Sequence, residues 1–141
     1  MIQRIQSVWL LLAAILAFVF TQLPIFIATV AGNVVKKFLP TESLLLFAIS
    51  VAVGLLALAC IFLYKNRPLQ LKLSIIGILA SVVLIAIEVW QISRFEADNS
   101  LLKGSYYWGS LLPIAVMVCF ILAASALRKD EKLVKSLDRL R

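Results

Sequence analysis

The sequence has 141 residues, of which 63% are apolar and 15% are charged, whereas soluble domains are about half apolar and about a quarter charged. This composition excludes an ordinary soluble domain, and four membrane spans of about 20 residues each would leave room only for short connections and a tail. The formal net charge of +7 is attributed to basic residues at the inner ends of membrane helices rather than to nucleic-acid binding.

The first apolar segment, residues 5–23, predicts the first membrane span. A basic start before an apolar core is also typical of a signal peptide, but the match to a cleavage site at 29–31 is weak and lies beyond Pro24. We therefore expect this segment to remain in the protein as a span.

The first outer loop, expected at 24–43, contains two short runs of β-branched and aromatic residues, 25–30 and 34–39. Gly32 and Asn33 lie between these runs, and glycine accepts the positive φ that a tight turn needs. The pattern favours a short outer β-hairpin, and the alternative is that the run at 25–30 prolongs the first helix.

Three further spans complete a predicted all-α bundle of four membrane helices over residues 1–127. Thr41 or Ser43 is placed to cap the second span, and Pro113 should either kink the fourth span or sit in its first turns. Each span is long enough for a hydrocarbon core of about 30 Å. The spans are expected at 44–64, 73–92 and 106–127, with an inner loop at 65–72 and a second outer loop at 93–105.

The distribution of Lys and Arg predicts that both termini face the cytoplasm. With four spans, the N-terminus, the inner loop and the C-terminal segment share one side and hold ten of the 14 basic residues. Cytoplasmic loops carry such an excess. Trp9, Trp90 and Trp108 fall near predicted span ends, as interfacial aromatic residues do.

One ionisable residue, Glu88, lies well inside a predicted span. An intramembrane carboxylate is costly and is by default a candidate functional group, and Gln91 lies one turn away on the same face. Together they would form a proton or cation relay. The alternative, which the shallow depth favours, is that Glu88 pairs with an outer base such as Arg94, Lys36 or Lys37, or reaches the headgroup layer.

The C-terminal segment, residues 128–141, predicts a basic amphipathic helix that continues the fourth span into the cytoplasm. At 100° per residue its basic and apolar side chains fall on opposite faces. Glu131 is spaced to pair with Lys135, and Asp138 with Arg141. The basic stripe consists of Arg128, Lys132, Lys135 and Arg139, and the apolar stripe of Leu133, Val134, Leu137 and Leu140.

The apolar stripe of this segment needs a partner, because positive-inside topology explains the basic residues but not the apolar face opposite them. Membrane lipid, a second copy of the chain, or another membrane or cytoplasmic protein would each bury it. Nucleic acid is not an expected partner, because the segment has no aromatic residue on which bases would stack.

The sequence predicts no catalytic, cofactor or metal site, and we do not expect an enzyme. It contains no histidine, which removes the commonest general base and metal ligand. Cys60 and Cys119 lie in apolar runs without a CxxC pair, where a thiol is usually unreactive. Walker, GxSxG and HExxH motifs do not occur in the sequence.

Three stretches resemble one protein family. The opening MIQRIQSVWLLLAA, the approach YYWGSLLPIA to the last span and the ending LRKDEKLVKSLDRLR are similar to domain-of-unknown-function family 4293. These are small integral membrane proteins of Gram-negative bacteria. The resemblance implies a bacterial inner membrane and four spans, and it implies no activity, ligand or catalytic residue.

The sequence thus favours a non-enzymatic membrane subunit or assembly factor that docks a partner protein through its C-terminal helix. A small transporter or channel component that uses Glu88 is the main alternative. A lipid-organising protein is a third reading, in which the basic segment binds anionic lipid.

Overall fold

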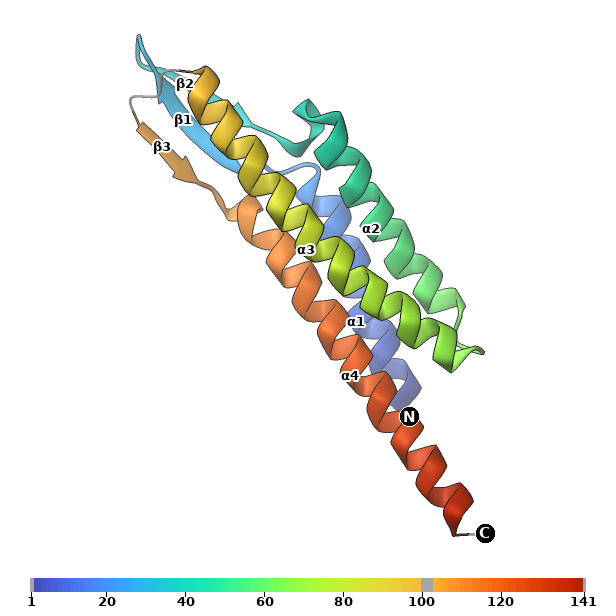
Figure 1. Ribbon diagram of the computed structural model, residues 1–141. Coiled ribbons are helices and arrows are strands. Elements are labelled where there is room, and N and C mark those ends of the chain that lie inside the picture. The colour runs from blue at the N-terminus through green and yellow to red at the C-terminus, as the bar shows by residue number, and fades with distance from the viewer. Residues whose placement is uncertain (1, 100–102, 141) are drawn as a thin grey trace.

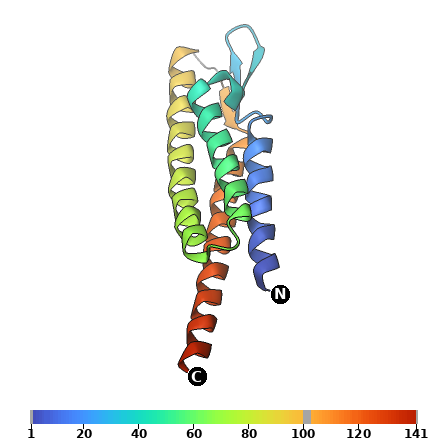
Figure 2. The ribbon, with the colours of Figure 1, turned by 90° about the vertical axis from the view of Figure 1, so that its right-hand side faces the viewer.

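The computed structural model describes residues 2–99 and 103–140. Within these residues, four long helices form an elongated bundle, and a small β-sheet lies at one end of it (Figures 1 and 2). Both chain ends lie toward the other end of the bundle (Figure 1). The helices are α1 (Ile2–Phe20), α2 (Leu44–Phe62), α3 (Arg67–Asp98) and α4 (Leu112–Arg139).

The four helices form a closed arrangement in which each has two principal neighbours. Helix α1 packs against α2 and α4, and α3 packs against the same two helices. A short turn at 63–66 joins α2 to α3, and it lies at the same end as the chain termini (Figure 2). The expected all-α bundle is therefore confirmed in its helical part, with a small sheet added to it.

Local sequence explains where three of the helices begin. Ser43 caps α2, because its Oγ accepts a hydrogen bond from the backbone N–H of Leu46 at 3.4 Å. Pro68 and Pro113 lie in the first turns of α3 and α4, where the missing backbone N–H would have no partner within the helix. Pro113 therefore starts α4 instead of kinking it, which is one of its two predicted roles.

The predicted hairpin is present. Strand β1 (Phe26–Val30) pairs antiparallel with β2 (Val34–Phe38). The turn between them contains Gly32 at φ 102° and Asn33 at φ 58°, and these two residue types tolerate positive φ better than others. The alternative, in which residues 25–30 prolong the first helix, is wrong, because α1 ends at Phe20.

A third strand was not predicted. Strand β3 (Lys103–Tyr106) pairs antiparallel with β1, so that the sheet order is β2-β1-β3. Residue 106, expected to open the fourth span, therefore belongs to the sheet. A short 3₁₀ helix (Trp108–Leu111) follows, and α4 begins only at Leu112.

Helix α3 extends beyond the expected span in both directions. It has 32 residues, or about 48 Å at 1.5 Å per residue, and includes much of the loops expected at 65–72 and 93–105. A fall in hydropathy does not end a helix when the following residues, such as Arg94 and Glu96, are good helix formers. By contrast, the segment expected at 5–23 ends early, since residues 21–23 are not helical.

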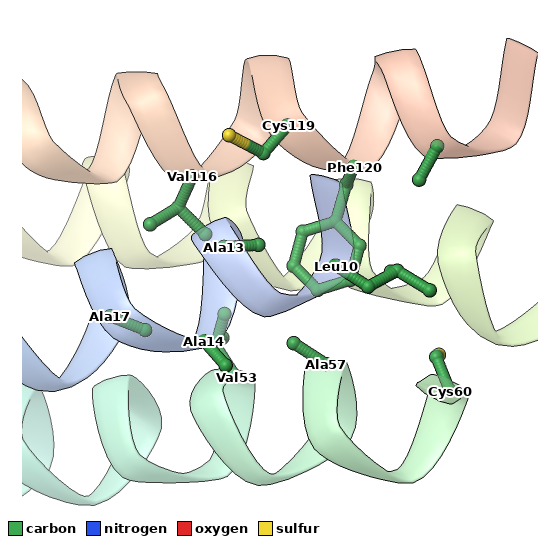
Figure 3. Close-up of a cluster of buried hydrophobic side chains, with 11 residues drawn as sticks. Leu10, Ala13, Ala14, Ala17, Val53, Ala57, Cys60, Val116, Cys119 and Phe120 are labelled. Atoms are coloured by element: carbon green, nitrogen blue, oxygen red, sulfur yellow. The ribbon is translucent and has the colours of Figure 1, made fainter. Parts of the chain in front are cut away.

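Small residues pack the middle of the bundle. Ala13 and Ala17 of α1 are fully buried with Val53 and Ala57 of α2 and Phe120 of α4 (Figure 3). In lipid, helices associate through such close backbone approach. The small-residue spacing at Ala13 and Ala17 thus serves internal packing.

Gly77 and Ser81 of α3 repeat this small-residue spacing, and Gly77 lies against α4. Both are buried, and a Cβ atom added at Gly77 would overlap the ring of Phe120. The absence of a side chain at Gly77 therefore makes room for the Phe120 ring and allows α3 and α4 to approach closely.

A second apolar cluster joins the sheet to the helix ends. Phe95, in the extension of α3, stacks on Phe38 with ring centroids 5.1 Å apart and meets the edge of Phe26 at 6.2 Å. Phe26 also makes an edge contact with Tyr106 at 5.5 Å. Packing against α3 thus supports the sheet. A small isolated hairpin in water would lack this support.

The outward faces of the helices are strongly apolar. Three helical segments, Leu44–Phe62, Arg67–Asp98 and Trp108–Arg139, are long and apolar enough to cross a membrane. The apolar part of α1, Ile5–Phe20, is shorter. These properties are those of a helical membrane protein.

Candidate functional site

The C-terminal part of α4 projects beyond the rest of the bundle (Figures 1 and 2). We call residues 128–139 the tail helix. It continues α4 without a break, and its basic residues are exposed. Leu133, Val134, Leu137 and Leu140, the tail apolar stripe, are 52%, 44%, 66% and 85% exposed. No contact within the described residues buries this stripe. The basic stripe comprises Arg128, Lys132, Lys135 and Arg139.

One of the two predicted charge pairs on the tail helix is present. Lys135 Nζ lies 3.0 Å from Glu131 Oε1, one helical turn away. Such an exposed pair contributes only about 0.3–0.5 kcal/mol. The other predicted pair, Asp138 with Arg141, involves a residue outside the described part of the chain.

A buried polar contact at the base of the tail helix was not predicted. Gln6 of α1 and Asp130 of α4 are 3% and 8% exposed, and Gln6 Nε2 donates a hydrogen bond to Asp130 Oδ2. Hydrogen bonds to charged groups are among the stronger ones in proteins. The contact joins the start of α1 to α4 where the tail helix begins. Its only sequence signal was an acidic residue on the apolar side of an amphipathic helix.

Glu88 is buried without a hydrogen-bonding partner for Oε1. Its residue is 3% exposed, and Oε1 has no hydrogen bond within the described residues. Gln91, on the same helix, instead donates to Ser43 Oγ at 2.9 Å. The sequence placed Glu88 and Gln91 together as a relay, but no hydrogen bond joins them in the described structure.

The expected pairing of Glu88 with an outer base is not found among the described residues. Arg94 lies over the Trp90 ring, 4.6 Å from its centroid, and Lys36 donates to Asn99 Oδ1 at 2.9 Å. Lys37 is exposed, whereas Glu88 is buried inside the bundle. A carboxyl group that is buried and unpaired calls for an explanation, because burial of a polar group without hydrogen bonds is unfavourable.

Further polar residues lie on the buried face of α3 that carries Glu88. Gln70, Ser74 and Ser81 are each at most 3% exposed. Ser74 Oγ and Ser81 Oγ donate to the backbone oxygens of Gln70 and Gly77, at 2.9 and 2.7 Å. Helical spacing places these residues along one side of α3. The sequence contained this pattern, but hydropathy alone did not distinguish it from scattered small residues.

No group of three or more His, Cys, Asp or Glu side chains is placed to hold a metal ion within residues 2–99 and 103–140. Cys60 and Cys119 are buried and free. The arrangement offers a projecting amphipathic helix and one unpaired buried carboxyl group as its two candidate features.

Comparison with known proteins identifies the protein family of this chain. Neither the curated proteins nor the solved structures provide a match to this chain. The family described as "Domain of unknown function (DUF4293)" matches residues 2–140, so the resemblance seen in the terminal stretches is confirmed over nearly the whole chain. This chain belongs to the DUF4293 family.

Proposed function

We propose that this protein is a non-enzymatic subunit or assembly factor of the bacterial inner membrane whose tail helix docks a cytoplasmic partner protein. All four helices cross the lipid, and both termini face the cytoplasm. The single observation that supports the docking role is the tail apolar stripe, which is exposed on a helix that projects from the bundle.

The length of α1 and the distribution of charge support the four-span topology. Helix α1 has 19 residues, or about 28 Å at 1.5 Å per residue, close to a hydrocarbon thickness of about 30 Å. The termini and the turn at 63–66 lie at one end of the bundle, and most basic residues are found in these segments. The positive-inside rule assigns that end to the cytoplasm.

The direction of the tail helix favours a protein partner over the membrane surface. An amphipathic helix that binds lipid lies in the plane of the interface. The tail helix instead continues along α4 (Figures 1 and 2) and reaches roughly 18 Å beyond Arg128. Leu137 and Leu140 then lie away from the lipid, so that their burial requires another macromolecule.

The two faces of the tail helix indicate the chemistry of its partner. The apolar stripe fits a hydrophobic groove that receives an amphipathic helix. The basic residues on the opposite face would meet acidic residues at the groove's rim, which contribute mainly to orientation and association rate. We therefore infer a cytoplasmic protein with an apolar groove and an acidic rim.

The test compares stripe variants with charge variants. Leu137→Ser with Leu140→Ser removes apolar surface from the stripe, and Lys132→Gln with Lys135→Gln removes charge from the other face. After purification in mild detergent, quantitative mass spectrometry should show one partner lost at least tenfold with the leucine variants and reduced less with the lysine variants. An unchanged set of co-purifying proteins in both would remove the tail helix as the docking element.

A small transporter or channel component is the second candidate function, because Glu88 is buried and its Oε1 is unpaired. Carboxyl groups of this kind mark proton and cation pathways in membrane proteins. Parent protein in liposomes would then show a proton or cation flux that Glu88→Gln abolishes. Glu96→Gln is the matched control, since Glu96 is exposed on the same helix. Absence of flux in the parent, or flux unchanged in Glu88→Gln, would exclude this function.

A further inference from the structure

A groove of about 360 Å³ lies between α1 and α4 at the base of the tail helix. Its walls are mainly apolar: Ile5 and Trp9 contribute from α1, and Leu122, Ala126 and Leu133 from α4. Ile5 and Leu122 are 54% and 38% exposed. The groove therefore opens on the outside of the bundle, on the surface that faces lipid in a membrane-spanning protein, and its volume is in the range of sites for small ligands.

Two lysines stand at the end of the groove nearest the tail. Lys129 lines it, and Lys132 follows on the adjacent exposed surface of the tail helix, which also carries Leu133 and Ser136. Asp130 also lines the groove, but its Oδ2 accepts the hydrogen bond from Gln6. The apolar walls thus lead to a site with two lysines and one partly engaged carboxylate.

The position of the groove along α4 corresponds to the membrane boundary. The apolar part of α4 ends at Leu127, and Arg128 and Lys129 follow directly. Trp9 lies on the opposite wall, and tryptophan is enriched at the level of lipid headgroups. Apolar walls within the membrane and lysines at its surface match a molecule that is apolar at one end and anionic at the other.

We propose that this groove binds one phospholipid with a net negative headgroup, at a site that borders the tail apolar stripe at Leu133. An acyl chain lies along Ile5, Trp9 and Leu122, and the headgroup phosphate contacts Lys129 and Lys132. This lipid site goes beyond the docking function, with which it shares the membrane orientation and the side chains of Lys132 and Leu133; Leu137 and Leu140 do not line it.

The occupant is a lipid rather than the apolar helix of another membrane protein. Such a helix would cover the walls but would provide no anion for Lys129 and Lys132. A phosphate group supplies that anion, and each surface base contributes favourably to attraction toward anionic lipid. Because the groove is open to the bilayer, a membrane lipid also reaches it without any movement of the helices.

Trp9 permits a direct test. With Trp90→Phe and Trp108→Phe, Trp9 is the one remaining tryptophan of the sequence, and lipids brominated on their acyl chains quench its fluorescence on contact. In one titration, brominated phosphatidylglycerol is mixed with unbrominated phosphatidylcholine; in the other, brominated phosphatidylcholine is mixed with unbrominated phosphatidylglycerol. Comparing the quenching of Trp9 in the two titrations gives the lipid preference at this groove. We expect about tenfold preference for the anionic lipid, and Lys129→Gln should reduce it about fivefold.

Two controls separate this site from general attraction to the surface. Lys72→Gln removes an exposed base of α3 that does not line the groove, and should leave the preference unchanged. Millimolar inorganic phosphate should not alter the quenching if the site holds a membrane lipid. Equal quenching by both lipids, an equal loss in Lys72→Gln, or displacement by phosphate would each overturn the proposal. Circular dichroism of every variant verifies that the helices are intact.

Discussion

Gln6 and Asp130, which are 124 residues apart in the sequence, are joined by a buried side-chain hydrogen bond from Nε2 to Oδ2. The bond fixes the start of α1 against α4 where the tail helix leaves the bundle. Because α4 runs unbroken through this point, its packing against α1 determines the direction in which the tail apolar stripe is presented. Presentation of the stripe to a partner therefore depends on packing inside the bundle as well as on the tail helix itself.

Loss of this hydrogen bond should weaken the bundle at the end where the tail helix leaves it. Gln6→Leu leaves the Asp130 carboxylate without its donor, at an expected cost of about 1–3 kcal/mol. The measurement is unfolding in mixed detergent micelles, with limited proteolysis of the tail as a local readout. Gln6→Leu with Asp130→Leu should recover most of the loss, because replacing both partners by apolar groups is nearly neutral. No recovery in the double variant would show that the bond is not the cause.

Gly77→Ala should destabilise the contact between α3 and α4. The new Cβ would overlap the fully buried ring of Phe120, and overpacking of a core costs about 1–3 kcal/mol. Gly54→Ala is the matched control: its Cβ would lie 3.0 Å from the tip of the Phe18 ring, and Phe18 is 37% exposed and has room to move. Equal loss of unfolding free energy in both variants would contradict this account of the helix contact.

Glu88→Met should stabilise the protein against unfolding. The substitution removes a buried group whose Oε1 has no hydrogen bond in the described residues, and an unsatisfied buried polar group costs about 1–3 kcal/mol. Functional sites often retain groups that reduce stability. A higher resistance to denaturant, together with loss of the flux described above, would assign Glu88 to transport. A destabilised Glu88→Met would instead show that the carboxyl group has a structural role.

The proposed orientation, with both termini in the cytoplasm, predicts that the tail helix lies on the cytoplasmic side of the membrane. After Cys60→Ala and Cys119→Ala, the variant Ser136→Cys places a single thiol on the exposed tail helix. A membrane-impermeant maleimide should label it in inverted vesicles and not in intact spheroplasts. A thiol at exposed Val35 in the β1–β2 hairpin, at the other end of the bundle, should give the opposite pattern. Labelling of residue 136 from outside the cell would contradict the orientation.

Local signals in the sequence predicted the helices, the hairpin and the cap of α2. Gly32 and Asn33 identified the hairpin because turn chemistry acts between neighbours in the chain. Strand β3 escaped prediction because its pairing of Lys103 with Thr29 is a long-range contact. Residues 103–106 contain Lys and Gly, which are poor strand formers, so that no local preference marked them.

The candidate site was predictable in part, for the same physical reason. The tail apolar stripe follows directly from helical periodicity. The environment of Glu88 could not be predicted, since the sequence could not show that Arg94 would stack on Trp90. The groove beside Trp9 likewise arises only when α1 and α4 pack together.

Photo-crosslinking in living cells tests the docking claim most directly. A photoreactive amino acid placed at Leu137, in the tail apolar stripe, is compared with the same amino acid at Lys135 on the basic face. We predict one discrete crosslink to a cytoplasmic protein from position 137, which weakens when Leu140→Ser is added, and less of the same product from position 135, which would lie at the rim of the partner's groove. Crosslinks from position 137 only to lipid or only to a second copy of the chain would contradict docking to a separate partner protein.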